Sequence, residues 1–143
     1  YLEPVATLDV DVFVTLQPEP GSLLATPRRI FDYLTARGGK INGEYIVISG
    51  WPVQFLPAGN PLVEEALAEA VDKDIGGVSA RVFTAEHLAA IALQTGRAKD
   101  KARLLQFIEA GAIGAKRFED IVVRNGLQLA WNRFKEYFVE GES

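Results

Sequence analysis

The sequence predicts an α+β fold: a mixed β-sheet core with flanking helices, followed by a C-terminal helical bundle. Three observations predict it. Residues 7–16 form an apolar run with acids at alternate positions, further strand-like runs alternate with two capped helical segments, and helical periodicity dominates from Thr84 onward. We place the boundary near residue 84, with residues 1–84 as the α+β core and residues 85–143 as the helical region.

Local signals predict each element in order. Strands are expected at residues 7–16, 45–48, 53–56 and 80–83, the middle two forming an antiparallel hairpin. The first two helices are expected to begin at Thr26-Pro27, with Thr26 as the N-cap, and at Asn60-Pro61, and to end at Gly38-Gly39 and near Asp72. Four more helices are expected at residues 84–96, 100–109, 116–125 and 127–138.

Composition limits the class of protein. The length of 143 residues suits one domain, and 48% hydrophobic residues suffice for a sizeable core. A net charge of −4 argues against broad, non-specific nucleic-acid binding, and the lack of cysteine excludes disulfides and thiolate metal sites. The lack of cysteine is also compatible with the cytoplasm, where we expect the protein, and no apolar stretch is long enough for a membrane span. The chain begins at Tyr1 without methionine, and we expect further sequence upstream.

Two acids one residue apart, Asp9 and Asp11, are the most informative feature of the chain. They lie in the apolar run from Leu8 to Val14, and on a strand they point to one face while Val10, Val12 and Val14 point to the other. Their Cα atoms would lie about 6.5–7 Å apart, so both carboxylates can reach one cation. Because two like charges in a half-buried site resist ionisation unless a cation lies between them, the pair predicts a divalent-metal site. The alternative is a solvated strand face.

The residues around this pair resemble a known family. Thr7–Val14 is similar to the T-x-D-h-D-h-h-h segment of the nucleotidyltransferase superfamily, where h is apolar. Glu86–Asp100 is similar to the E-x-L-h-A-h-x-L helix and the G-R-x-K-D that follows it in a small prokaryotic branch related to abortive-infection type IV toxins. With Val53–Pro57 in the intervening strand, the resemblance extends through most of the chain.

The resemblance implies a nucleotidyltransferase-like fold and metal-dependent transfer of a nucleoside monophosphate. Asp9 and Asp11 would be the catalytic residues and would hold Mg²⁺, the cofactor that neutralises the charge of a nucleoside triphosphate. A nucleoside monophosphate would then pass to an RNA or protein acceptor. Arg97 and Lys99 would meet the triphosphate or anionic groups of the acceptor, and Asp100 would orient one of them. Gln54 aligns with a third carboxylate of many relatives, and an amide there should lower metal affinity.

Other readings stay open. With Gln54 in place of an acid, no glycine-serine turn upstream and Ala92 where several relatives have lysine, the chain could be a catalytically silent binding or regulatory module, such as a toxin–antitoxin component. A metal-dependent phosphohydrolase is a third reading, which the lack of further histidines disfavours. Arg97–Asp100 also suits a plain helix connection, with Gly96 ending one helix and Asp100 capping the next.

Several charged and aromatic residues are expected to have structural rather than functional roles. His87, the only histidine, is expected to be solvated or structurally bonded rather than catalytic. Glutamates 64, 65 and 69 are read as a solvent-exposed helix face, and the basic residues of the C-terminal region, Arg124 among them, as a solvated face. Trp51 and Trp131 are read as core residues rather than stacking platforms for bases.

Overall fold

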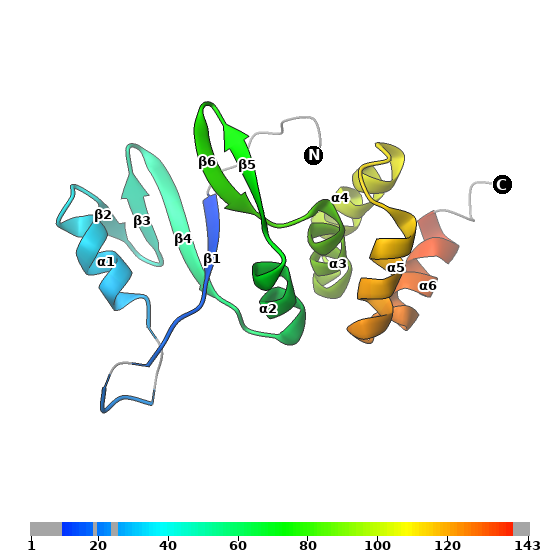
Figure 1. Cartoon of the computed structure of the whole chain (residues 1–143), viewed down its shortest axis with the longest axis horizontal. Helices are drawn as coiled ribbons and strands as arrows, with labels where there is room; N and C mark the ends of the chain where they lie inside the picture. The colour runs from blue at the N-terminus through cyan, green and yellow to red at the C-terminus, as the bar shows by residue number, and fades with distance from the viewer. Residues whose placement is uncertain (1–9, 19, 24–25, 139–143) are drawn as a thin grey trace. The chain divides into compact units, whose positions relative to one another are not determined.

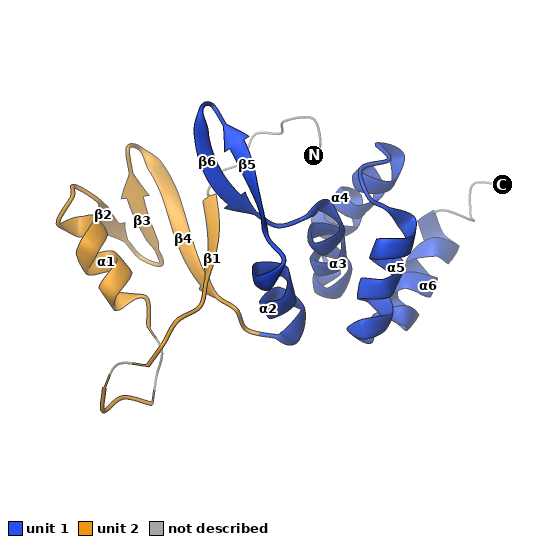
Figure 2. Ribbon diagram, viewed as in Figure 1, with its two compact units in different colours: residues 1–3, 60–143 blue, residues 4–59 orange. Residues whose placement is uncertain are grey.

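The computed structural model describes residues 10–18, 20–23 and 26–138. Its described residues contain a mixed sheet of four strands, a two-stranded sheet and six helices, which confirms the α+β class (Figure 1). The chain divides into two compact units between Gly59 and Asn60 (Figure 2). In chain order, the first unit ends at Gly59 and is orange in Figure 2, and the second begins at Asn60 and is blue. The boundary expected near residue 84 lies inside the second unit, where a strand gives way to a helix.

The first unit is built on the mixed sheet. Its strands are β1 (Val10–Val14), β2 (Lys40–Asn42), β3 (Tyr45–Ile48) and β4 (Trp51–Pro57), arranged in the order β1-β4-β3-β2. β1 runs parallel to β4, whereas β3 is antiparallel to both β4 and β2. The predicted hairpin of β3 and β4 is confirmed, and its turn uses Ser49 and Gly50, both at positive φ as a two-residue hairpin turn requires.

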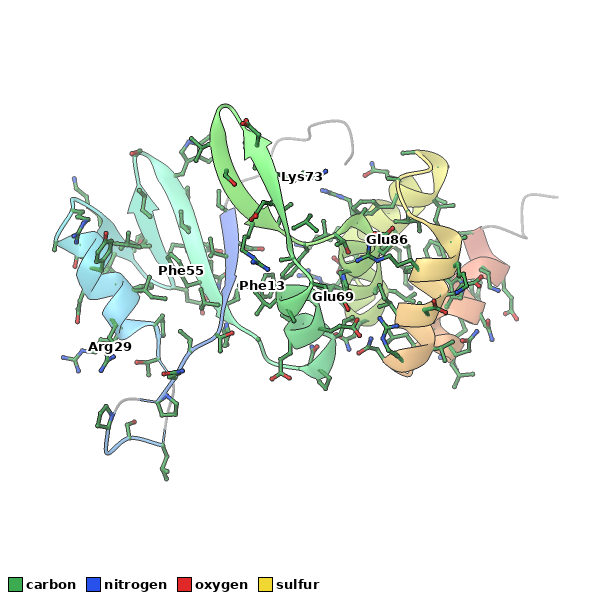
Figure 3. All side chains as sticks on the ribbon, viewed as in Figure 1. Phe13, Arg29, Phe55, Glu69, Lys73 and Glu86 are labelled. Atoms are coloured by element: carbon green, nitrogen blue, oxygen red, sulfur yellow. The ribbon has the colours of Figure 1, made fainter. Side chains whose placement is uncertain are left out.

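One helix of this unit, α1 (Arg28–Thr35), follows β1 and precedes β2 in the sequence. The edge-to-face contact of Phe31 with Phe55, at 6.3 Å between ring centroids, packs α1 on the face of β4 that carries Phe55. Phe55 is labelled on β4 in Figure 3. The helix ends at Thr35, and the turn that follows contains the predicted glycine pair, where the Gly39 N–H bonds the carbonyl of Leu34 at 2.9 Å. The predicted N-cap at Thr26 is wrong, because Pro27 occupies the cap position and contributes no side-chain bond.

Alternation along the strands gives the sheet two chemically different faces. Asp11 lies opposite Gln54 in the parallel register, and Val12 lies opposite Phe55. Asp11 and Gln54 therefore share the face opposite to the one covered by α1. β1 is shorter than the expected strand at 7–16: residues 7–9 lie outside the described residues, and Thr15 and Leu16 are not in the strand.

The second unit begins with α2 (Pro61–Ala68) and a hairpin of β5 (Val71–Ile75) and β6 (Val78–Val82). The Asn60 side chain accepts a bond from the Val63 N–H at 3.0 Å, which confirms the predicted helix start. The prediction that this helix continues to Asp72 is wrong. Val71 begins a strand instead, because the chain turns at Gly76 and Gly77 and pairs β5 with β6.

Four helices complete this unit: α3 (Ala85–Thr95), α4 (Ala98–Glu109), α5 (Ala115–Arg124) and α6 (Gln128–Phe138). Thr84 caps α3 and Gly96 ends it in the left-handed conformation, both as predicted. The core of the bundle contains Phe118, Trp131 and Phe134, with Phe118 and Trp131 in edge-to-face contact at 4.9 Å. Trp131 is thus a core residue as predicted, whereas Trp51 is 56% exposed and is not.

Candidate functional site

The first candidate site lies on the sheet face that carries Asp11 and Gln54. Their positions face each other across β1 and β4, so the parallel register brings two of the predicted site residues to adjacent places on one face. Asp11 is exposed and Gln54 is half-buried. Asp9 lies outside the described residues, so its predicted place beside Asp11 stays a prediction.

A third polar residue on this part of the sheet was missed in the sequence. Gln54 donates from Nε2 to Oε2 of Glu44 at 3.2 Å. Glu44 lies in the two-residue turn between β2 and β3 and is exposed. No local sequence signal identifies it, because its approach to Gln54 depends on the pairing of β2, β3 and β4.

The donors on this face are compatible with a hard cation. Asp11 and Glu44 supply carboxylates and Gln54 an amide carbonyl, and oxygen ligands of these types are those that Mg²⁺ accepts. Within the described ranges, no three acids or histidines lie close enough together to hold a metal ion by themselves. A complete set of ligands would therefore need Asp9, water or oxygens of a substrate.

The predicted phosphate-binding residues lie in the second unit, at the connection from α3 to α4. Arg97 is the residue before α4 and pairs with Asp100 in its first turn, Nε to Oδ2 at 2.7 Å. Asp100 also accepts from the Arg97 backbone N–H at 3.3 Å. The expectation that Asp100 is the N-cap is wrong, because Arg97 holds that position. Lys99 is exposed, and within the described part of the chain it makes no ion pair.

A buried polar network lies elsewhere in the second unit. His87 is fully buried, with Nδ1 at 2.7 Å from Oγ1 of Thr84 and Nε2 at 2.9 Å from Oε2 of Glu65. An ionised Glu65 only accepts, so Nε2 of His87 donates to it. The Thr84 oxygen accepts from the His87 backbone N–H at 3.2 Å. Both ring nitrogens of His87 therefore have a hydrogen-bond partner.

Glu65 connects this network to the surface. Its Oε1 accepts from Nε of Arg124 at 2.8 Å, so a helix face read as solvent-exposed in the sequence is tied to two other helices. The hydrogen bond from Arg124, aided by the one with His87, holds the pKa of Glu65 below its ordinary value against the opposing effect of burial. The same hydrogen bond raises the pKa of Arg124.

This network has the order of a nucleophilic triad, hydroxyl to imidazole to carboxylate, but its burial excludes that role. Thr84 is only 5% exposed, and its oxygen already accepts a backbone bond at the start of α3. A nucleophile must reach its substrate. The network is therefore structural, in agreement with the reading of His87 as a structurally bonded residue.

Comparison with known proteins gives no further assignment, because no family model and no curated protein matches this sequence. In the part of the chain that the structure describes, no helix combines the length and apolar character needed to cross a bilayer.

Proposed function

We propose that the protein is a Mg²⁺-dependent nucleotidyltransferase that moves a nucleoside monophosphate from an NTP to an RNA or protein acceptor. One observation carries the proposal: Asp11 and Gln54 lie side by side on one face of a mixed sheet, with α1 on the opposite face. The resemblance aligns Gln54 with a third carboxylate on a later strand, and in the parallel register this position pairs with Asp11. The proposal rests on that agreement and on the sequence resemblance.

Charge explains why the metal would be needed for binding. Asp11 and Glu44 are acids, and the resemblance adds Asp9, so this face would repel a triphosphate unless a divalent cation lies between them. Asp11, with Asp9, would hold the ion, which would neutralise the charge that develops on the phosphates. The Gln54 amide donates to Glu44, which leaves its carbonyl oxygen to accept from a water or hydroxyl on this face.

A second candidate function is a silent nucleotide-binding or regulatory module, such as a toxin–antitoxin component. Gln54 favours it, because an amide brings no charge to the position and its N–H is already bonded to Glu44. The Arg97–Asp100 pair also favours it, since the arginine read as a phosphate ligand is engaged in its own helix start.

Label transfer tests the proposal. The protein is incubated with Mg²⁺, each α-³²P-labelled NTP and total cellular RNA and protein, and labelled acceptors are separated on a gel. We expect transfer that falls at least about 100-fold in Asp11→Asn, because the variant keeps the shape of the proposed metal ligand but not its charge. Asp32→Asn is the matched control: Asp32 is an exposed acid on α1, paired only weakly with Arg28 at 4.0 Å.

The outcomes separate the two candidates. Transfer by the parent protein that survives in Asp11→Asn contradicts the proposed mechanism. If no acceptor is labelled but Mg²⁺-dependent NTP binding is present and lost in Asp11→Asn, the silent module replaces the enzyme. If Mg²⁺ and NTP do not bind at all, both candidates fail.

A further inference from the structure

A small pocket in the helical unit is separate from the site proposed above. It has a volume of about 280 Å³ and lies between the C-terminal end of α3, the first half of α4 and the part of α6 from Ala130 onward. Its floor is apolar and rigid, because Leu93, Leu104 and Phe134 are at least nine-tenths buried in the core of the bundle. The pocket is therefore a fixed feature of this unit.

Aromatic rings form one wall of the pocket. Phe134 and Phe138 are stacked with their centroids 4.8 Å apart, and Tyr137 is 79% exposed beside them. Exposed aromatic rings gathered at a concave surface are typical of ligand sites, where flat apolar groups pack against them. Across the pocket, Gly96 has no side chain, and a Cβ there would meet only its own helix at 3.8 Å.

The charge at the rim has one sign. Of the described residues that line the pocket, Lys101 and Arg133 are charged, and none is an acid. Among the residues that the structure describes, neither cation forms an ion pair or a side-chain hydrogen bond. The two cations outweigh the partial negative charge of the nearby α3 C-terminus, which is about half of one charge.

We propose that this pocket binds a small aromatic carboxylate, with its rings on the apolar floor and its carboxylate between Lys101 and Arg133. The size supports a small molecule: a cavity of about 150 Å³ accommodates benzene, so 280 Å³ suits two fused rings with a short acidic arm. The rim supports an anion, since a guanidinium and an ammonium both donate to a carboxylate. The binding needs neither Asp11 nor a metal, so it is independent of the proposed transferase activity.

The test is an NMR titration of the ¹⁵N-labelled protein with 1-naphthylacetate. We expect amide shifts confined to residues 93–104 and 130–138 and a dissociation constant below about 1 mM. The neutral analogue 2-(1-naphthyl)ethanol has the same rings without the charge and should bind at least about tenfold more weakly. In Lys101→Gln/Arg133→Gln, the affinity for the acid should fall by at least about tenfold and the affinity for the alcohol should not change.

A matched control and a blocking variant complete the test. Arg103→Gln removes an exposed cation of α4 that does not line the pocket, so binding should remain within about twofold of the parent protein. Ala130→Phe fills the pocket and should abolish binding of both ligands. The proposal is overturned if the alcohol binds as well as the acid or if the double variant binds like the parent protein. It is also overturned if no shifts occur in these two segments at about 5 mM ligand, which is above the expected dissociation constant.

Discussion

Replacing His87 by leucine should destabilise the protein by about 3 kcal/mol. The imidazole makes two buried bonds, one of 2.7 Å with the hydroxyl of Thr84 and one of 2.9 Å with the carboxylate of Glu65. A neutral hydrogen bond contributes about 1 kcal/mol and one to a charged group about 2 kcal/mol. Leucine keeps most of the apolar volume, so the loss of these two bonds dominates the change in the free energy of unfolding.

Urea unfolding measures this loss in the unit that contains His87. In a Trp51→Phe background, Trp131 is the only tryptophan, and it lies buried in the helical core with Phe118. With a slope of about 1–3 kcal/mol per molar urea, a loss of about 3 kcal/mol lowers the midpoint by roughly 1–3 M. The slope itself should not change, since the same surface is exposed on unfolding.

The control for this experiment is Glu64→Gln. Glu64 is exposed beside Glu65 on α2, and within the described residues its side chain has no hydrogen-bond or ion-pair partner, so the change should cost less than about 0.5 kcal/mol. A loss below about 1 kcal/mol in His87→Leu would refute the reasoning, because it would mean that the two buried bonds add almost nothing to stability.

Three further predictions concern the same unit. The pKa of Glu65 is lowered on folding, so its carboxylate stabilises the fold at pH values above its unfolded pKa, and this stabilisation is lost as the pH falls through the folded pKa. Arg124→Gln should therefore flatten the dependence of stability on pH below about pH 4.5, measured by urea unfolding at several pH values. Gly96→Ala forces a side chain into the left-handed region at φ 69° and should cost about 1–2 kcal/mol, seen as a lower midpoint of thermal unfolding. Asn60→Ala removes the side-chain cap of α2 and should cost about 1 kcal/mol by the same measurement, whereas no loss would mean that the cap is unimportant.

Local signals in the sequence predicted the elements that they control. Asn60 followed by proline, and Thr84 and Gly96 at the two ends of α3, each act within one helical turn, so their meaning does not depend on the rest of the fold. The hairpin of β3 and β4 was equally readable, because strand-like residues flank a turn containing Gly50.

Features that depend on contacts between residues far apart in the sequence could not be predicted from it. Val71 continues the spacing of α2 as well as it starts a strand, and only the ladder with Val82 decides between them. Glu65 resembles any exposed acid in the sequence, since its partners His87 and Arg124 are 22 and 59 positions away.

The sequence predicted part of the candidate site and missed another part, for the same reasons. Strand alternation and the resemblance named Asp11 and Gln54, and the register of β1 on β4 makes them neighbours. Glu44 was missed, because its bond to Gln54 spans ten residues and needs β2, which is short and carries only one large apolar residue.

The most direct test of the proposed function is where a divalent ion binds. Mn²⁺, added in small amounts to the ¹⁵N-labelled protein, broadens the amide signals near its site, and Mg²⁺ in excess should reverse the effect. We predict selective broadening at Asp11, Gln54 and their neighbours on β1 and β4, lost in Asp9→Asn/Asp11→Asn and kept in Asp32→Asn. Broadening that leaves β1 untouched, or that persists in the double variant, would contradict the claim that these acids hold the ion.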